Sequence, residues 1–360
     1  MSHYDIAIVG AGIVGATLAA ELAPHASVLM LESEDQPGYH STGRSAAFWS
    51  ETYGGPAIQP LTSASTAAFA AGGFLQPLGS ISIGRAEDEA AIDAFMATFA
   101  DTDVVLERVH PATLIPGLRD DWVLGVWEPS CAYIDVGGLH GAALGTAKRA
   151  GAVLATGAGL QAAERRDGRW RLSTAAGAFT ADVLVNAAGA WADPVAALAG
   201  AGPLRIQPYR RTVVQMRTDP VAPETLPHVA GINHDFYFKP EAGGRLWLSP
   251  SDETPVDPHD CAPEELDVAI AIDRFEQVVD WRVAAVERRW AGLRSFAPDR
   301  LPVYGFDADM PGFFWAAGQG GFGIQTAPAA ARMAAVMLLG RGEMPAGVDP
   351  MRYRPDRFLT

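Results

Sequence analysis

The segment YDIAIVGAGIVG, residues 4–15, is the most informative part of the chain for its fold class. Tyr4–Val9 is a short apolar run, which is typical of a strand buried on both faces of a sheet. Glycines follow at positions 10, 12 and 15, and Ala16–Ala23 has the composition of a helix. Ser27–Leu31 is a second β-prone run, and it ends at Glu32. This order predicts a strand–helix–strand unit that carries the dinucleotide fingerprint in its usual context.

Each glycine of the fingerprint has a physical role. Gly10 allows the tight turn, Gly12 lets the backbone approach a pyrophosphate, and Gly15 lets helix and strand pack closely. The helix N-terminus then offers N–H groups to the phosphates. Glu32 can accept hydrogen bonds from a ribose diol, and its charge disfavours the 2′-phosphate of NADP. The motif predicts a bound dinucleotide; a purely structural glycine turn is the alternative.

The fingerprint alone does not distinguish FAD from NAD. The next segment, GYHSTGRSA at residues 38–46, is small and polar and contains one cation, Arg44. Such a segment can line a flavin phosphate and ribityl chain with hydroxyl groups, N–H groups and Arg44. From composition alone, an ordinary surface loop is the alternative reading.

Composition excludes several classes of protein. The 360 residues fit one large or two interleaved domains, and 49% hydrophobic with 19% charged residues excludes a disordered chain. Lys plus Arg number 27 and Asp plus Glu 42, so the net charge of −15 disfavours nucleic acid and anionic membranes as partners. Cys131 and Cys261 form no CxxC pair. We therefore expect no metal site, and the cysteine usage suits a reducing cytoplasm.

One apolar stretch, Ile6–Ala23, could be mistaken for a membrane span. A signal peptide would begin with basic residues, whereas this stretch follows Asp5 and contains Glu21. A buried strand, turn and helix explain it better, and we expect no membrane anchor.

The rest of the chain alternates between helical and β patterns. An Asp-Gly pair within residues 166–169 predicts a hairpin, and the Pro- and Asp-rich residues 249–263 predict an exposed loop. The other expected helices cover residues 88–100, 138–150 and 263–281, with a last one ending near 339; the other expected strands cover 123–127, 153–156, 181–186, 211–216, 235–239, 245–248 and 313–316.

Five ordered motifs carry a resemblance to a known family. They are the fingerprint, GYHSTGRSAA (residues 38–47), VLVNAAGAW (183–191), WAGLRSF (290–296) and FFWAAGQGGFGIQT (313–326). Together they resemble the D-amino-acid oxidase superfamily of flavoproteins, and within it most of all the D-arginine dehydrogenases. The similarity covers nearly the whole chain, with gaps near residues 76–84 and 220–232.

The resemblance implies an α/β fold of two domains. A glutathione-reductase-type, Rossmann-like FAD domain would comprise residues 1–78, 135–205 and 285–360. A smaller α+β substrate domain, with a curved mixed or antiparallel sheet, would comprise residues 79–134 and 206–284. FAD would be bound non-covalently.

The resemblance also implies the site residues. Arginine suits a carboxylate clamp because its guanidinium donates paired hydrogen bonds, and Arg211 and Arg294 match the family's clamp positions, while Arg210 is expected to be structural or solvated. From residue type alone, a surface arginine is the alternative for each. The other implied substrate-site residues are Tyr237, Tyr53, Phe48, Gly321 and Gln325.

The implied FAD site draws on all the motifs. Residues 320–325 lead into a helix whose N-terminus can face the flavin pyrimidine ring and stabilise negative charge there on reduction. The implied cofactor-binding residues are Gly10, Gly12, Ile13, Val14, Gly15, Glu32, Ser33, Ser41, Thr42, Arg44, Ser45, Ala46, Leu160, Ala188, Gly189, Trp191, Arg294, Gly320, Gly321, Phe322, Gly323, Ile324 and Gln325.

The implied reaction is oxidation of a D-amino acid by hydride transfer from the α-carbon to flavin N5. Water then hydrolyses the imino acid to a 2-oxo acid and ammonia. Two departures argue against D-arginine itself. Phe48 replaces the family's histidine near the amino group, and residues 79–82 lack the acid that meets the guanidinium, while Glu87 lies in a turn. With Phe236, Phe322 and Trp49 expected nearby, a neutral or hydrophobic side chain is predicted.

Other functions stay open at this point. Glycine, sarcosine and other N-substituted amino acids need the same carboxylate clamp, and so does a 2-hydroxy acid, although its oxidation ordinarily requires a base such as histidine. A non-catalytic flavin- or nucleotide-binding module would leave the paired arginines unexplained, and an NAD-dependent dehydrogenase would leave the C-terminal glycine motif unexplained. The electron acceptor, quinone-type or O2, is not readable.

Overall fold

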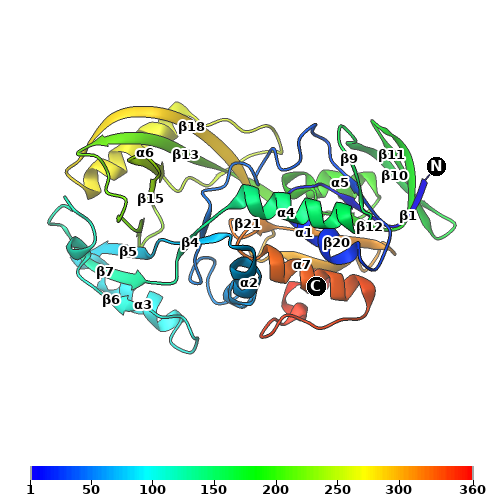
Figure 1. The fold of residues 1–360 in the computed structure, drawn as a ribbon, viewed down its shortest axis with the longest axis horizontal. Helices are drawn as coiled ribbons and strands as arrows, with labels where there is room; N and C mark the ends of the chain where they lie inside the picture. The colour runs from blue at the N-terminus through cyan, green and yellow to red at the C-terminus, as the bar shows by residue number, and fades with distance from the viewer. Residues whose placement is uncertain (1, 359–360) are drawn as a thin grey trace.

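Two large sheets, one in each lobe of an elongated molecule, organise the chain (Figure 1). The computed structural model describes residues 2–358. The fold is α/β with mixed, open sheets, as predicted. The fingerprint follows the first strand of the first sheet, and the two candidate clamp arginines lie in the second sheet. The way the two sheets are arranged therefore determines whether these residues can form one site.

The first sheet has eight strands in the order β10-β11-β12-β1-β2-β9, with β20 beside β12 and β19 beside β20. Its centre is parallel, because β1 pairs in parallel with β12 and β2, and β20 with β12. β10 and β11 form the predicted hairpin. The strands are β1 (Ser2–Val9), β2 (Val28–Leu31), β9 (Val153–Ala155), β10 (Leu160–Arg166), β11 (Arg169–Thr174), β12 (Gly177–Asn186), β19 (Val303–Phe306) and β20 (Phe313–Ala317).

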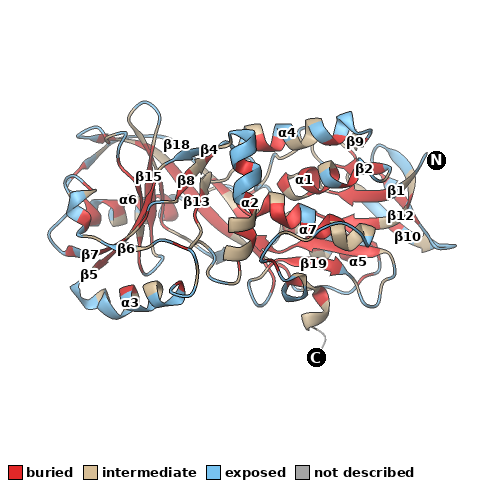
Figure 2. Cartoon of the chain, turned by 60° about the horizontal axis from the view of Figure 1, so that its bottom comes forward, coloured by how far each residue is buried: buried red, intermediate tan, exposed pale blue. Residues whose placement is uncertain are grey.

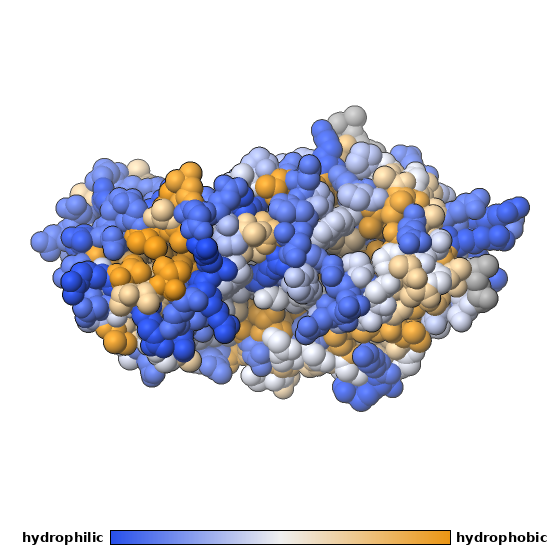
Figure 3. Space-filling view, turned by 90° about the horizontal axis from the view of Figure 1, so that it is seen from above, coloured by the Kyte–Doolittle hydropathy of each residue, from blue (hydrophilic) through white to orange (hydrophobic). Residues whose placement is uncertain are grey.

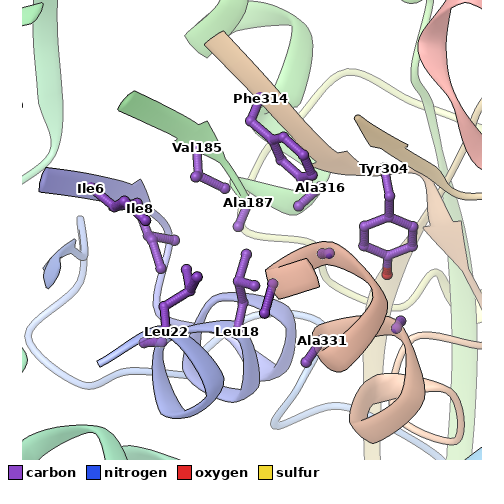
Figure 4. Packing of buried hydrophobic residues seen from close by; sticks show 14 of the residues in the cluster. Ile6, Ile8, Leu18, Leu22, Val185, Ala187, Tyr304, Phe314, Ala316 and Ala331 are labelled. Atoms are coloured by element: carbon purple, nitrogen blue, oxygen red, sulfur yellow. The ribbon is translucent and has the colours of Figure 1, made fainter. Parts of the chain in front are cut away.

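Helix α1 packs on this sheet between two others. It contacts α4 and α7, and Leu18 and Leu22 of α1 face the strand residues Ile8 and Val185 in a buried hydrophobic core (Figure 4). Burying such side chains contributes about 1.5–3 kcal/mol each. The helices are α1 (Ile13–Leu22), α2 (Gln59–Gly72), α3 (Glu89–Thr98), α4 (Val136–Arg149), α5 (Ala192–Leu198), α6 (Glu265–Val278) and α7 (Ala327–Leu339), with single 3₁₀ turns at Ala86–Asp88, Pro111–Thr113, Gly189–Trp191, Pro350–Tyr353 and Pro355–Phe358.

The second sheet is mostly antiparallel and has ten strands in the order β21-β18-β13-β16-β15-β14-β5-β7-β6, with β17 beside β13. Helix α6 covers one of its faces, where Phe238 meets Phe275 in a buried cluster. Its strands are β5 (Ser80–Arg85), β6 (Glu107–Arg108), β7 (Trp122–Glu128), β13 (Gln207–Asp219), β14 (His228–Gly231), β15 (Tyr237–Glu241), β16 (Arg245–Ser249), β17 (Thr254–Pro255), β18 (Arg282–Phe296) and β21 (Gln319–Gly320).

A small third sheet lies between the lobes. It consists of β3 (Phe48–Trp49), β8 (Ala132–Ile134) and β4 (Leu75–Pro77). Figure 2 shows buried strands running through both lobes, with helix α2 between them. The third sheet therefore places Phe48 beside the junction of the two lobes.

Several boundaries differ from the predicted ones. The first helix begins at Ile13 rather than Ala16, because the Thr42 hydroxyl accepts a hydrogen bond from the Ile13 N–H and serves its first turn. The loop at 249–263 is not wholly exposed: it contains β17, and the side chain of Asp252 is only 7% exposed. The predicted domain boundary at residue 285 falls inside β18.

The surface is mixed in character. Figure 3 shows hydrophilic side chains over most of the face seen from above, with an apolar patch on the lobe that holds the second sheet. Among the described residues, no helix has both the length and the apolar content needed to cross a bilayer.

Candidate active site

A cavity of about 500 Å³ is lined by segments of both large sheets. This volume lies within the usual range for small-molecule and cofactor sites. One end is lined by the fingerprint and by residues 31–34, and the other by side chains of β13, β15 and β18. Most residues of 38–48 and 319–325 also line it, together with residues 187–191, and all three segments overlap the motifs found in the sequence.

At the fingerprint end, the backbone leaves no room for side chains. Gly10 has a φ of +98°, and a Cβ there would lie 2.5 Å from the Ala187 carbonyl oxygen. A Cβ on Gly15 would lie 1.9 Å from the Gly10 carbonyl oxygen. Gly15 therefore packs helix against loop, as its predicted role requires, but it does not line the cavity.

Two side chains hold the glycine loop in place. The Glu32 carboxylate accepts hydrogen bonds from the backbone N–H groups of Ala11 at 2.9 Å and Glu34 at 3.1 Å. The Thr42 hydroxyl accepts from the Ile13 N–H at 3.0 Å. The N-terminus of α1 lies at the cavity wall, where its dipole favours an anionic ligand.

Arg44 lines the cavity, but its guanidinium is already engaged. It donates to the carbonyl oxygens of Cys261 at 2.8 Å and Ala291 at 3.2 Å, and it pairs with Asp260. This ion pair holds the pKa of Asp260 below its usual value. Arg44 thus lies at the cavity, as the resemblance implies, with its guanidinium bonded to protein groups. Arg44 fastens the 249–263 loop beside the cavity.

At the other end, strand pairing brings Arg211 and Arg294 together. Tyr209 of β13 lies opposite Arg294 of β18, and Arg211 lies opposite Gly292. The two arginines are thus diagonal neighbours on the same face of the sheet, within reach for side chains of this length. Both line the cavity.

The two guanidinium groups are unequally anchored. Arg211 is buried and donates to the Asp252 carbonyl oxygen at 2.8 Å and to Glu253 at 3.4 Å. Arg294 is half-buried, and among the described residues it has no ion pair. Burial, together with the charge of Arg294, lowers the pKa of Arg211. Arg211 is also 3.8 Å from the Asp252 carboxylate, so Arg294 is the member of the pair that no described carboxylate neutralises, and this end of the cavity suits an anion.

Arg210, by contrast, points away from the site. It pairs with Glu264, with Asp267 at 2.9 Å and with Asp252 at 3.9 Å, and it does not line the cavity. Its place agrees with the structural role expected from the sequence. Neighbouring residues on a strand face opposite sides, so only one of the two consecutive arginines can serve the site.

Aromatic side chains surround the arginine pair. The Tyr53 hydroxyl lies against Gly321 and Arg294: a Cβ on Gly321 would be 2.1 Å from that hydroxyl and 3.2 Å from the Arg294 Cζ. Phe48 packs between Tyr53, with ring centroids 5.2 Å apart, and Tyr237, at 6.0 Å. The Tyr237 hydroxyl is buried without a hydrogen-bond partner. A bound ligand could satisfy it.

Gln325 reaches the cavity wall, yet its amide serves the protein. Its Nε2 donates to the Tyr53 carbonyl oxygen at 3.1 Å and to the Thr62 hydroxyl at 2.9 Å, and its Oε1 accepts weakly from the Ser50 N–H at 3.4 Å. The side chain therefore fixes the segment around Tyr53.

Three predicted aromatic residues lie elsewhere. Phe322 does not line the cavity and packs behind Tyr53, against Phe296. Trp49 lies in a buried cluster with α2, and Phe236 lies in the core of the second sheet. Adjacent strand residues point to opposite faces, so Phe48 and Tyr237 face the cavity while these neighbours do not.

The other predicted residues line the cavity, and some lining residues were missed. The predicted ones are Ile13, Val14, Ser33, Ser41, Ser45, Ala46, Leu160, Ala188, Gly189, Trp191, Gly320, Gly323 and Ile324. Val213 and Ser295 were missed, although two-residue alternation from Arg211 could have identified Val213. His228 was also missed; its ring lies 4.5 Å from that of Phe48, and it does not line the cavity. Nothing in its sequence surroundings marks it.

Comparison with known proteins supports this architecture. Residues 5–337 match the family model described as FAD dependent oxidoreductase. The bifunctional protein ThiO/ThiG of Synechocystis sp. is 28% identical over 252 residues, which are 68% of this chain and 36% of that protein. Glycine oxidase of Geobacillus kaustophilus is 26% identical over 349 residues, 91% of each chain. The structure of L-proline dehydrogenase from P. horikoshii superposes with a TM-score of 0.87 at 22% identity, covering 99% of this chain and 98% of that one.

This chain spans about a third to a half of the bifunctional relatives that it matches. The cavity residues fit the cofactor of the matched family: the fingerprint offers a glycine cradle in which a Cβ would clash, and the start of α1 can receive a pyrophosphate. The chain therefore belongs to the family of FAD-dependent oxidoreductases, and FAD is its cofactor.

Proposed function

We propose that this protein oxidises a D-amino acid with a neutral or hydrophobic side chain to the imino acid, which water hydrolyses to a 2-oxo acid and ammonia. One observation carries the proposal: Arg211 and Arg294 face one end of the cavity together, with two tyrosines and no lining carboxylate beside them. Bound FAD would supply the hydride acceptor. The chain's own residues then have to bind and orient the substrate.

The arginine pair would hold the substrate carboxylate. Paired guanidinium donors fix both its position and its orientation. The Tyr237 hydroxyl, now without a partner, and the Tyr53 hydroxyl beside Arg294 would add hydrogen bonds. The Phe48 ring would cover the bound molecule from water. None of these groups has to transfer a proton for the substrate to be held.

The charges around the cavity support a neutral side chain. Among the described residues that line it, the carboxylates are Glu32 and Glu34, both at the fingerprint end. A guanidinium or ammonium on the substrate side chain would meet Phe48, Tyr53 and two arginines. Burying such a charge without a partner costs several kcal/mol. D-Arginine should therefore be a poor substrate.

Glycine and small N-substituted amino acids are the second candidate class. The similarity to glycine oxidase over 91% of both chains favours them, and the same clamp would bind their carboxylate. A 2-hydroxy acid is less well served. His40 lines the cavity but its ring bonds Glu34 at 2.9 Å, and His228, which packs on Phe48, does not line it.

The test is anaerobic mixing of the flavin-loaded protein with separate D-amino acids, their L-enantiomers, glycine, sarcosine and 2-hydroxy acids, while the visible flavin band is followed. We expect D-leucine, D-methionine or D-phenylalanine to bleach the band at least about 100-fold faster than D-arginine, given the cost of an unpaired charge. Faster bleaching by glycine or sarcosine would favour the second class. Rapid bleaching by D-arginine would refute the neutral side chain. Admitting O2 afterwards would distinguish an oxidase from an enzyme that uses a quinone-type acceptor.

A further inference from the structure

A buried carboxylate outside the cavity lining holds the segment that leads to Tyr53. Glu128, the last residue of β7, is 4% exposed. It accepts hydrogen bonds from the Ser50 hydroxyl at 2.9 Å, the Thr52 hydroxyl at 2.7 Å and the Glu51 N–H at 2.7 Å. Its carboxylate thus meets three consecutive residues of one short segment.

That segment carries both aromatic walls of the site. It begins at β3, which contains Phe48, and continues to Tyr53. Glycines with φ of +97° and +76° follow at positions 54 and 55, so a sharp turn rather than a helix comes next. The segment's backbone also meets Gln325, at Ser50 and Tyr53. Residues 50–53 are therefore held between Glu128 of the second sheet and Gln325.

Burying the Glu128 carboxylate costs free energy, and this cost bears on why the residue is there. Burial raises the pKa of Glu128, because a desolvated carboxylate is unfavourable. Its hydrogen bonds compensate only if all the donors are in place. An apolar residue at this depth would avoid the cost, so a fold-only role gives little reason for a carboxylate here.

We propose that Glu128 is a positioning residue: by holding residues 50–52, it sets the Tyr53 hydroxyl against Arg294 and Gly321, where the substrate carboxylate binds. The effect on substrate binding rests on the proposed function, whereas the contact between Glu128 and residues 50–52 does not depend on it. Glu128 lies opposite Ser80 in the pairing of β7 with β5, so it is fixed in the second sheet. Its carboxylate therefore joins that sheet to the segment that carries Tyr53. A shift of its carboxylate would move the Tyr53 side of the clamp relative to the arginine side.

The first test compares Glu128→Ala with two other variants. The double variant Ser50→Ala/Thr52→Val removes hydroxyl donors from the opposite side of the same contact, and Glu128→Gln retains an acceptor for the Glu51 N–H. We expect Glu128→Ala to raise KM roughly tenfold or more with a smaller change in kcat, the double variant to act in the same direction, and Glu128→Gln to restore part of the loss. An unchanged KM in the folded, flavin-loaded Ala and double variants would overturn the proposal.

Glu287 offers a matched control. It lies on β18 of the same sheet. Its carboxylate accepts hydrogen bonds from Gln215 at 3.0 Å, from Arg217 at 2.5 Å and from Arg245 at 2.7 Å, and none of these partners belongs to the segment 50–53. Glu287→Ala also removes a carboxylate that accepts several hydrogen bonds, although an exposed one, and it should leave KM unchanged. In a Tyr53→Phe background, Glu128→Ala should raise KM much less than in the native protein, because both act through one hydroxyl. If the effects of the two substitutions on KM were fully additive, Glu128 would not act through the Tyr53 hydroxyl.

A second readout does not depend on turnover. Hydrogen exchange at the Glu51 amide and its neighbours should accelerate at least about tenfold in Glu128→Ala and stay unchanged in Glu287→Ala. If no amine in the panel reduces the flavin but exchange accelerates, the substrate assignment fails while the contact is supported. Unaltered exchange in Glu128→Ala would overturn the positioning role, whatever the substrate.

Discussion

The two ends of the cavity are built in opposite ways. At the fingerprint end, consecutive residues of one loop present backbone atoms, and a Cβ on Gly15 would lie 1.9 Å from a carbonyl oxygen. At the clamp end, Arg211 and Arg294 come from positions 83 residues apart (294 − 211) and present side chains whose charges matter. A close-packed backbone site tolerates no added atom, whereas a charged site tolerates no lost charge. The two ends should therefore fail differently when altered.

The largest expected effect is at the fingerprint end. Gly15→Ala would force a Cβ into the Gly10 carbonyl, and backbone on both sides cannot yield cheaply. We expect loss of bound flavin and of most folded protein, measured by the visible absorbance and thermal unfolding. The control is Gly141→Ala in α4, where an added Cβ meets nothing within 4 Å. Because alanine favours helix, this variant should be as stable as the native protein or slightly more so. Flavin binding at native level by Gly15→Ala would contradict the comparison.

The next effect is at the clamp end. Arg211→Ala and Arg294→Ala should each lower kcat/KM for the best substrate by roughly 100-fold or more, because a charged hydrogen-bonding partner of the carboxylate is lost. Flavin content should stay at the native level. The matched control is Arg289→Ala, on the same strand as Arg294 but exposed and paired with Glu265. It should change kcat/KM less than about twofold. If both clamp variants lose flavin instead of activity, the division of labour between the two ends is incorrect.

The smallest effect concerns the wall behind the clamp. Burial, with Lys239 nearby, lowers the pKa of His228 to about 3. The unfolded chain then binds a proton that the folded one does not, so stability should fall as the pH drops below about 6.5, by at most about 1.4 kcal/mol per pH unit. His228→Gln should flatten this dependence in urea unfolding between pH 7 and pH 5. The exposed His25→Gln should leave it as in the native protein. An equally steep dependence in His228→Gln would assign it to other groups.

The fold class and the fingerprint end of the cavity could be predicted because both depend on residues that are close together in the sequence. The order of a short apolar run, three glycines and an acid at Glu32 predicts the strand–helix–strand unit and a dinucleotide ligand, and the structure has this unit, with the Glu32 carboxylate at the glycine loop. Helix starts were less accurate. The first turn of α1 depends on Thr42, which lies 29 residues away, so no window of local sequence contains it.

The sequence could not predict which site residues are buried or which of their polar groups already have hydrogen-bond partners in the protein. Arg44 matched a cofactor motif, yet its guanidinium pairs with Asp260, more than 200 residues later. Phe322 and Gln325 lie in one motif, but the former packs behind Tyr53 and the latter donates to its backbone. Glu128 and His228 carry no motif and became visible only through what surrounds them.

Residue types at fixed spacing along one segment were enough to predict the strand–helix–strand unit, the glycine cradle and, by resemblance, the family. Three facts about the site needed the folded chain: that Arg211 and Arg294 share one face, which of two consecutive arginines serves the site, and that Glu128 holds the Tyr53 segment. These facts depend on strand register and on contacts between distant segments. Register is set by the pairing of β13 with β18 along their whole length, and no local pattern encodes it.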